Sequence, residues 1–356
     1  MNDVEFLALL VHRGHLERTD AERLVPELKG GAALDDLLVD VVGWEPERVE
    51  ELRRTRAGEI PELPGFDVQT RIGVGGTADV FRALDRRGGQ RGKPVALKVL
   101  KPEATRHTPT RKAFIAEARL LEKLKHPNLV QCFGVARSGN TFFSMLEYVE
   151  GNTALELLDE RGAMGEAEAL RVILGAAEAL RYLSANGIVH RDVKPGNVMV
   201  TAKGGVKLID LGFAVSGEDA CEQPTDSTVG TAAYVSPEQA RGAAGADARS
   251  DVYSLGISLF HLVVGRLPFE GSDDQELLRR QVMESLSSPE LKGRGISPHL
   301  HYFIEKMVAK DAEDRYQGFD ELISDIEEQL RGRDEMDFTA PPAQRTGTRA
   351  VRRRRH

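Results

Sequence analysis

Residues 189–200 read VHRDVKPGNVMV, and this short stretch concentrates polar side chains within an apolar sequence. The polar residues are His190, Arg191, Asp192, Lys194 and Asn197. A buried strand does not tolerate so many unpaired polar groups, because removing each from water without a partner costs about 2–7 kcal/mol. These side chains therefore need partners, and a bound ligand would supply them.

A second polar position follows shortly afterwards, where residues 206–214 read VKLIDLGFA. This apolar run leads into Asp210, which is followed by a leucine and a glycine. Asp192, Asn197 and Asp210 offer the oxygen ligands that Mg²⁺ prefers, together with a carboxylate that can accept the proton of a hydroxyl group. The pattern favours a magnesium-bound triphosphate and an attacking hydroxyl group.

Residues 71–84, RIGVGGTADVFRAL, form a glycine-rich turn between two predicted strands. Gly73, Gly75 and Gly76 would let backbone amides approach phosphate oxygens, because glycine has no Cβ. An ordinary hairpin turn is the alternative for this pattern taken alone.

A lysine interrupts the next predicted strand, PVALKVL at residues 94–100. The ammonium group of Lys98 would be costly to bury there unless a carboxylate paired with it. The helix predicted for residues 110–125 offers Glu117 as that partner, and an ordinary surface position is the alternative for this glutamate.

The first part of the chain, residues 1–60, has the apolar spacing of amphipathic helices. The sequence TDAE at residues 19–22 has the form of a capping box at a helix start. Two closely spaced prolines then predict a linker over residues 58–65, because proline cannot continue a helix. No internal repeat is evident in the sequence.

From residue 66 the pattern changes to short β-rich runs around one helix, and this extends to residue 149. The predicted strands are FDVQTRIG (66–73), ADVFRAL (78–84), VALKVL (95–100) and TFFSMLEYV (141–149). Residues 150–330 are mostly helical, and residues 332–356 lose apolar periodicity and are expected to form a disordered basic tail. The predicted fold class is therefore α+β, with a β-rich lobe followed by an α-helical lobe.

Composition excludes several classes of protein. A chain of 356 residues with 41% hydrophobic residues can build a sizeable core, and its net charge of −8 argues against binding nucleic acid. Two cysteines are too few for a disulfide framework or a zinc site. The start lacks an uninterrupted apolar core, and no stretch reaches the roughly 18–20 apolar residues of a membrane span. We therefore expect a cytoplasmic protein without a membrane span.

Taken together, the motifs resemble the protein-kinase signature set in order and spacing. They are Gly73, Gly75, Val80, Lys98, Glu117, HRDVKPGN, DLG, SPE and DVYSLG. The resemblance covers residues 66–330, and GTAAYVSPEQARG looks most like bacterial Hanks-type serine/threonine kinases. It implies a bilobal protein-kinase fold, ATP and Mg²⁺ as cofactors, and transfer of the ATP γ-phosphate to serine and threonine hydroxyls of proteins.

The resemblance implies a role for each residue around the phosphates. Lys98, paired with Glu117, would hold the α and β phosphates, whereas Asn197 and Asp210 would bind Mg²⁺. Such a site works mainly by positioning groups and neutralising charge.

Three further residues would act on the substrate side. Asp192 would orient the substrate hydroxyl and accept its proton, and Lys194 would neutralise the transferring phosphoryl group. Thr231 looks like the matching hydroxyl of the substrate-binding loop. His190 is expected to pack and to form hydrogen bonds rather than to act as a base.

The resemblance also implies which residues surround the nucleotide. They are Ile72, Gly73, Val74, Gly75, Gly76, Val80, Ala96, Lys98, Leu146, Glu147, Val149 and Met199. Two positions depart from the family pattern. Ala78 replaces the third glycine of the glycine-rich loop, and Leu211 replaces the commoner phenylalanine of DFG.

Regulation is suggested by Arg191, because a guanidinium beside the catalytic aspartate can pair with a phosphate. The candidate acceptors of that phosphate are Thr225 first, then Thr228, with Ser227 between them. The alternative is that these are ordinary polar loop residues. Glu238 and Arg315 match a buried ion pair of the family, and Asp251 would anchor the catalytic loop.

The expected partners are proteins that carry serine or threonine. The resemblance also allows self-association for phosphorylation in trans, which nothing in the sequence requires. Two alternatives remain: a pseudokinase scaffold without chemistry, and a kinase-like enzyme acting on small molecules. Residues 1–60 faintly resemble the N-terminal domains of type II secretion ATPases, but we expect a helical interaction or regulatory domain.

Overall fold

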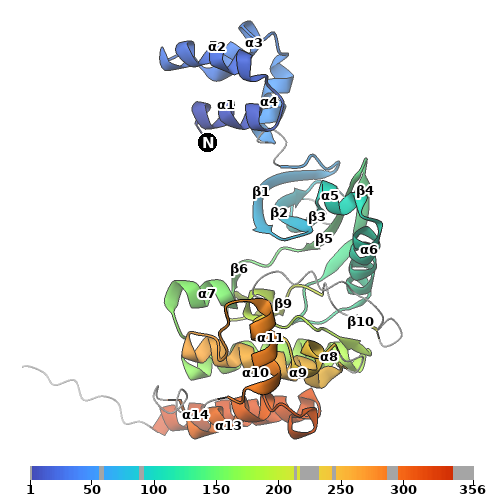
Figure 1. Ribbon diagram of the computed structural model, residues 1–356, viewed down its shortest axis with the longest axis vertical. Coiled ribbons are helices and arrows are strands. Elements are labelled where there is room, and N and C mark those ends of the chain that lie inside the picture. The colour runs from blue at the N-terminus through green and yellow to red at the C-terminus, as the bar shows by residue number, and fades with distance from the viewer. Residues whose placement is uncertain are drawn as a thin grey trace, which may run out of the picture. The chain divides into compact units, whose positions relative to one another are not determined.

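The computed structural model describes residues 2–55, 60–87, 92–211, 215–216, 232–242, 246–286 and 296–339. The chain forms two compact units, and each is described by itself. The first unit consists of Met1–Gly151 with Thr201–Ala214, and the second consists of Asn152–Val200 with Val215–His356. The elements of both are labelled in Figure 1.

The chain starts with four helices that share one apolar core. They are α1 (Asp3–His12), α2 (Arg18–Lys29), α3 (Leu34–Asp40) and α4 (Pro46–Arg54). Phe6, Leu10, Leu24, Leu34 and Leu38 are all completely buried in this core. The arginine Arg53 lies over the ring of Phe6 at 4.3 Å and forms ion pairs with Asp3 and Asp35, which tie α4 to α1 and α3.

These helices form a tandem repeat, so the prediction that the chain contains no internal repeat is wrong. Leu38 follows Leu10 by 28 residues, and Leu52 follows Leu24 by the same interval. All four side chains are buried in the common core. Helix α4 likewise begins 28 residues after α2. The repeat is hard to see in the sequence because few positions are identical. They include the buried pairs Leu10 and Leu38, and Leu24 and Leu52.

Helix α2 begins two residues earlier than the predicted capping box requires, at Arg18 rather than Asp20. Its N-cap is Glu17, and no side chain caps it. The hydroxyl of Thr19 therefore lies within the first turn, and the capping-box prediction is wrong. The predicted linker also differs from expectation, because Ile60 and Leu63 are buried in the core of the sheet that follows.

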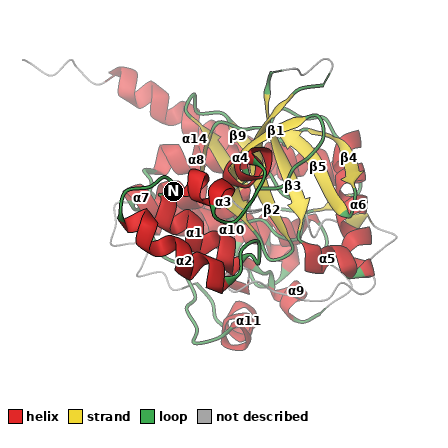
Figure 2. Cartoon of the chain, turned by 90° about the horizontal axis from the view of Figure 1, so that it is seen from above, coloured by secondary structure: helices red, strands yellow, loops and turns green. Residues whose placement is uncertain are grey.

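The β-rich part is one antiparallel sheet of five strands in the order β1-β2-β3-β5-β4, seen from above in Figure 2. The strands are β1 (Phe66–Val74), β2 (Ala78–Asp85), β3 (Pro94–Leu100), β4 (Cys132–Ser138) and β5 (Thr141–Glu147). Two helices accompany it, α5 (Pro102–Arg106) and α6 (Thr108–Lys123). The sequence did not predict β4 or α5, but it predicted the other four strands and α6 to within a few residues.

Alternation along the strands gives the sheet two different faces. Val95, Leu97 and Val99 of β3 point into a core that also contains Phe81 and Phe143. The intervening residues of β3 therefore lie on the opposite face. This alternation decides where Lys98 points.

The remaining elements are mostly helices of the second unit. They are α7 (Ala154–Arg161), α8 (Glu166–Ala185), α9 (Pro237–Ala240), α10 (Ala248–Val264), α11 (Asp274–Met283), α13 (Pro298–Met307) and α14 (Phe319–Thr339), with short 3₁₀ turns at η2 (Pro195–Asn197), η3 (Ala232–Tyr234) and η4 (Ala312–Asp314). Short strands are β6 (Gly151–Thr153), β7 (Ile188–Val189), β8 (Val198–Thr201), β9 (Val206–Leu208) and β10 (Val215–Ser216). Helix α10 is buried along nearly its whole length and forms the centre of this unit.

Helix α14 continues to Thr339, so the predicted disorder from residue 332 onward is wrong for its first eight positions. The helix is anchored by the buried Leu322, Ile323 and Ile326, and once a helix is nucleated each added residue costs less than the first turn did. The rest of the predicted tail, residues 340–356, lies outside the described residues.

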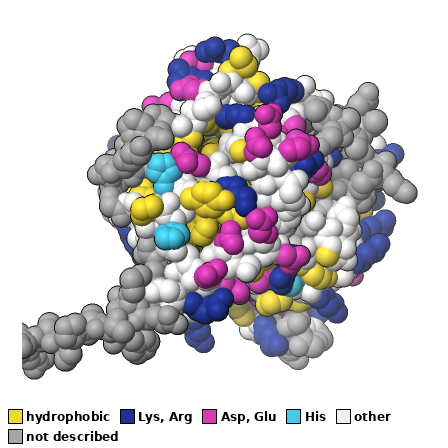
Figure 3. Space-filling view, turned by 90° about the horizontal axis from the view of Figure 1, so that it is seen from below, with side chains coloured by type: hydrophobic (Ala, Val, Ile, Leu, Met, Phe, Trp, Pro, Cys, Tyr) yellow, Lys and Arg dark blue, Asp and Glu magenta, His cyan; other side chains and the backbone are white. Residues whose placement is uncertain are grey.

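No helix within the described ranges is long and apolar enough to cross a membrane. Figure 3 shows one face of the molecule from below, where acidic and basic side chains are interspersed among uncharged ones.

A buried ion pair joins distant parts of the second unit, as the sequence predicted. The guanidinium of Arg315 donates to both carboxylate oxygens of Glu238, at 2.8 and 2.9 Å. The side chain of Arg315 is completely buried, and Ser250 donates a further hydrogen bond to Glu238. Burial opposes ionisation of Glu238, but the hydrogen bonds from Arg315 and Ser250 outweigh it and lower its pKa to about 2.

We expect Glu238→Gln to lower the free energy of unfolding by about 3–5 kcal/mol, because it leaves a buried guanidinium without its counter-ion. Urea denaturation at pH 7 measures this loss. Glu22→Gln is the matched control, because the pair of Glu22 with Arg18 is 68–85% exposed and contributes little.

The loss of stability in Glu238→Gln should depend on pH. A carboxylate with a lowered pKa stabilises the fold above its ordinary pKa of 4.5, and this contribution is lost as the pH falls toward about 2. The stability difference between wild type and Glu238→Gln should therefore shrink between pH 5 and pH 2. A difference that stays constant over this range would contradict the account.

Candidate functional site

The glycine-rich turn is a tight hairpin between β1 and β2. The amide of Gly75 donates to the carbonyl of Ala78 at 3.0 Å, and a Cβ on Gly75 would lie only 2.8 Å from that same oxygen. Position 75 therefore requires glycine. The neighbouring side chains of Ile72 and Val74 are 47% and 71% exposed, which is unusual for large apolar residues and leaves them free to cover a ligand.

Lys98 has the predicted carboxylate partner and a second one. Its Nζ donates to Glu117 Oε1 of α6 at 2.8 Å and to Asp210 Oδ1 at 3.1 Å. Asp210 follows β9, whose Leu208 exchanges two backbone hydrogen bonds with residues 128 and 130. Three segments that are far apart in sequence thus bring one ammonium and two carboxylates together in the first unit.

The electrostatics of this cluster favour a charged lysine. Burial acts to lower the pKa of Lys98, but the two carboxylates outweigh it and raise that pKa above its ordinary value. Burial and the nearby Asp210 raise the pKa of Glu117, while Lys98 opposes them. Two carboxylates, Glu117 and Asp210, share the single positive charge of Lys98. This arrangement suits the binding of a further cation.

The residues predicted to surround a nucleotide base share the sheet face of Lys98. Val80 lies directly opposite Lys98 across β2 and β3, and Ala96 lies opposite Leu146 across β3 and β5. All four are on the face turned away from the Val95, Leu97 and Val99 core. The amide of Glu147 donates to the carbonyl of Gln131, so this N–H is not available for a ligand.

The polar stretch at residues 190–197 forms its own network in the second unit. Lys194 Nζ lies 2.9 Å from Asp192 Oδ2, and Asn197 Nδ2 donates to both the backbone and the side chain of Asp192. Asp192 is only 8% exposed. An ionised aspartate held by an ammonium and an amide is a fixed acceptor, which is what a proton-accepting group requires.

A carboxylate from the central helix holds the backbone of this loop. Asp251 of α10 accepts hydrogen bonds from the amides of His190 and Arg191, both at 2.8 Å. Arg191 has a φ of 67°, in the left-handed region that non-glycine residues rarely adopt. The anchoring role predicted for Asp251 is therefore confirmed.

His190 is structural in this arrangement. Its ring is completely buried, and Nδ1 accepts a hydrogen bond from the amide of Asp192 at 3.2 Å. Nε2 therefore carries the proton, and it has no hydrogen-bond partner among the described residues. The expectation that His190 packs rather than serves as a base fits this geometry.

Arg191 presents a buried nitrogen without a partner. Its Nε has no hydrogen bond among the described residues, whereas its carbonyl accepts one from Gln239. The predicted acceptors Thr225, Ser227 and Thr228 lie outside the described residues, as does Thr231.

Each of the two predicted magnesium ligands has a donor that suits Mg²⁺. In the second unit, Asn197 uses its amide nitrogen to bind Asp192, which leaves its side-chain oxygen for a cation. In the first unit, Asp210 has a carboxylate that is 39% exposed. The described residues contain no group of three or more His, Cys, Asp or Glu side chains that could hold a metal alone. Mg²⁺ usually takes one or two carboxylates from the protein and completes its shell with water and phosphate.

The remaining predicted nucleotide contacts are Val149, which is buried, and Met199, which is half-buried on β8. Sequence reasoning missed Gln239, whose side chain holds the carbonyl of Arg191, and Lys101, whose Nζ donates to the carbonyl of Gly75. Two features of the sequence could have indicated them. Lys101 directly follows an apolar strand, and Gln239 directly follows the SPE motif.

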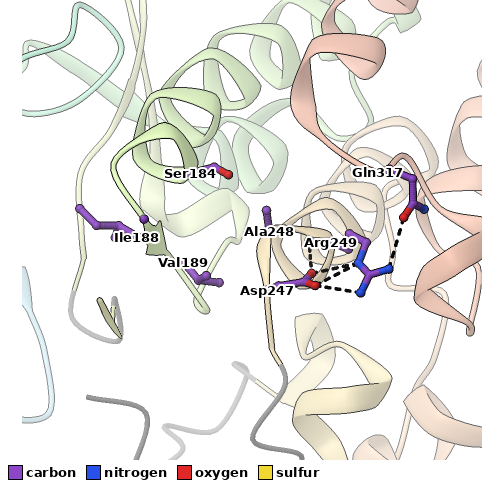
Figure 4. A pocket seen from close by; sticks show the side chains of 8 residues that line it. Ser184, Ile188, Val189, Asp247, Ala248, Arg249 and Gln317 are labelled. Carbon is purple, nitrogen blue, oxygen red and sulfur yellow. Dashed lines mark hydrogen bonds and ion pairs between the residues drawn. The ribbon is translucent and has the colours of Figure 1, made fainter. Parts of the chain in front are cut away.

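A surface pocket of about 450 Å³ lies elsewhere in the second unit, between the end of α8, strand β7 and the start of α10 (Figure 4). Its arginine, Arg249, is held by Asp247 and Gln317. None of the predicted catalytic residues lines this pocket.

Comparison with known proteins agrees with this geometry. Residues 66–325 match the family model described as the protein kinase domain. The chain is 36% identical over 256 residues to a probable serine/threonine-protein kinase of Clostridium perfringens, covering 72% of this chain and 37% of the relative. It is 36% identical over 260 residues to the serine/threonine-protein kinase PknB of Mycobacterium leprae, covering 72% and 41%.

A probable serine/threonine-protein kinase of Streptomyces coelicolor is also 36% identical, over 73% of this chain and 39% of the relative. The chain thus spans about two fifths of the length of these curated relatives. The predicted α+β class, with a β-rich part before a helical part, is confirmed by the five-stranded sheet and the helices that follow it. With a family model that matches residues 66–325, the chain belongs to the protein kinase family, and its likeness is to bacterial members of the Hanks type.

Proposed function

We propose that this chain is a serine/threonine protein kinase that transfers the γ-phosphate of ATP to hydroxyl groups of proteins. One observation carries the proposal: Asp192 is buried, oriented and charge-paired in a loop that is fixed by Asp251. A scaffold without chemistry would have no use for so many buried polar groups around one carboxylate, because each is costly to bury.

In this proposal each cluster has a defined task. Lys98 binds the α and β phosphates and is kept in place by Glu117. Asp210 and Asn197 would hold Mg²⁺, which neutralises charge on the phosphates when bound. Asp192 orients the attacking hydroxyl and takes its proton, and Lys194 offsets charge on the transferred group. The exposed apolar side chains of Ile72 and Val74 cover the nucleotide.

Several finer points belong to the same proposal. The substrates are proteins with accessible serine or threonine, self-association serves phosphorylation in trans, and the chain acts in the cytoplasm. The helical repeat of residues 1–60 recruits substrates or modulates activity, residues 66–330 form the kinase domain, and the basic residues after 339 form a tail.

The direct test is phosphate transfer from ATP to dephosphorylated casein in the presence of Mg²⁺. We expect Asp192→Asn to lower the rate at least about 100-fold, because the variant cannot accept the hydroxyl proton. ATP affinity should stay within about twofold of wild type, since Asp192 does not bind the nucleotide. Lys112→Met, an exposed change on α6, is the control and should transfer normally.

Two outcomes would contradict the proposal. Wild-type protein that binds ATP but transfers no phosphate to casein or to itself would favour the pseudokinase scaffold. An Asp192→Asn variant as fast as wild type would remove Asp192 from the chemistry.

Arg191 supports a second element of the proposal, activation by phosphorylation of Thr225, Ser227 or Thr228. Its Nε is buried and has no hydrogen-bond partner within the part of the chain that the structure describes, and a phosphate could supply one through charge-assisted hydrogen bonds. Autophosphorylated wild type should be about tenfold more active than the same protein after phosphatase treatment.

In Arg191→Gln that ratio should fall close to one, because the variant lacks the cation that would bind the phosphate. Mass spectrometry establishes which of the three residues carries phosphate in each sample. An unchanged ratio in Arg191→Gln would show that the phosphate acts through another residue.

A further inference from the structure

Helix α11 is attached to the second unit in an unusual way. Of its ten residues, Asp274–Met283, all of which the structure describes, only Gln281 is buried. Gln281 is completely inaccessible, whereas Met283 near it is 74% exposed. Gln281 is therefore the one residue of this helix whose side chain is fully enclosed.

Both polar atoms of the Gln281 side-chain amide have hydrogen-bond partners. Its Oε1 accepts a hydrogen bond from Tyr253 Oη of α10 at 2.6 Å, and its Nε2 donates to the carbonyl of Ala233 in η3. Buried amides are expensive to leave unpaired, so this pair of bonds fixes the orientation of the side chain. Gln281 thus connects the central helix α10 to the turn Ala232–Tyr234.

Lys310 completes the network from a third direction. Its Nζ donates to Tyr253 Oη at 2.9 Å and to the backbone carbonyl of Gln281 at 2.7 Å. The same ammonium lies over the rings of Phe269 and Tyr253, at 4.4 and 5.2 Å. Because the ammonium donates to Tyr253, the tyrosine hydroxyl is free to give its own proton to Gln281.

We propose that Gln281, held by Tyr253 and Lys310, is a positioning residue that fixes the turn Ala232–Tyr234 for binding of the protein substrate. This rests on the proposed function, in which GTAAY at residues 230–234 belongs to the substrate-binding loop. The carbonyl of Ala233 is held by an amide that belongs to another helix. Loss of that donor releases the turn but leaves the nucleotide residues and Asp192 unchanged.

The charge of Lys310 supports this assignment. Burial, together with the nearby cations Arg315 and Arg241, lowers the pKa of Lys310 to about 8, and Glu284 acts in the opposite direction. The lysine is therefore mostly charged at pH 7 and loses its charge as the pH rises above 8. Its bonds to Tyr253 and Gln281 are charge-assisted only below that pH.

The test uses the full chain with Gln281→Glu, which keeps the size of the side chain and its acceptor but removes the donor to Ala233. The KM for casein should rise about tenfold, because a buried carbonyl loses its hydrogen bond and faces a carboxylate instead. The KM for ATP and the rate of ATP hydrolysis without casein should stay within about twofold of wild type.

A control variant and a second variant in the same network distinguish the proposed effect from a general loss of stability. Ser258→Ala removes a buried hydrogen bond within α10 and should leave both KM values unchanged. Tyr253→Phe removes only the hydroxyl group, and its effect on the KM for casein should not add to that of Gln281→Glu, since both act through one network.

A pH profile distinguishes positioning from a general structural role. In wild type the KM for casein should rise between pH 7 and pH 9, as Lys310 loses its charge. In Lys310→Met the KM should be high and constant over this range, with the same casein and ATP. A parallel rise in both proteins would overturn the role of Lys310.

Hydrogen exchange separates failure of this inference from failure of the proposed kinase activity, because it needs no catalysis. Amides in the segment 232–235 should exchange faster in Gln281→Glu than in wild type or Ser258→Ala. Unchanged exchange together with an unchanged KM for casein would overturn the inference. Faster exchange in a protein that phosphorylates nothing would retain the positioning role and reject the kinase proposal.

Discussion

The loop at residues 190–197 depends on one buried carboxylate. Asp251 is 2% exposed, its two oxygens accept hydrogen bonds from the amides of His190 and Arg191, and the backbone at Arg191 lies in the left-handed region. Burial raises the pKa of Asp251, while the backbone amides of His190 and Arg191 and the guanidinium of Arg191 favour the ionised form. Because α10 is the most deeply buried helix of its unit, it offers the loop a rigid support, and the orientation of Asp192 follows from that support.

The same solution recurs elsewhere in the chain, where several partners converge on one buried polar group. Lys98 is held by Glu117 and Asp210, Arg315 by Glu238, and Gln281 by Tyr253 and Lys310. Each network joins segments that are distant in sequence. Removing one partner leaves the others buried and unpaired, so each group is more costly to lose than an exposed ion pair of the same chemistry.

The sequence predicted the elements whose pattern is local and the residues whose chemistry is unusual for their surroundings. Lys98 in an apolar strand and the polar stretch at residues 190–197 stood out because burial of such groups demands partners, and those partners are present. Strand β4 was missed because it is mixed in polarity, with burial varying from residue to residue. The burial of Gln281 could not be predicted from the sequence. A glutamine in a polar helix is expected to be exposed, and only tertiary contacts bury this one.

The most direct test of the central claim is the rate of phosphate transfer by Asp251→Asn, measured beside its affinity for ATP. The substituted amide offers one oxygen and a donor group where two amides of the loop need acceptors, so Asp192 should lose its orientation. The account predicts a transfer rate at least about 100-fold below that of wild type, with ATP affinity within about twofold. A variant that binds ATP and transfers phosphate at the wild-type rate would show that the loop does not depend on Asp251.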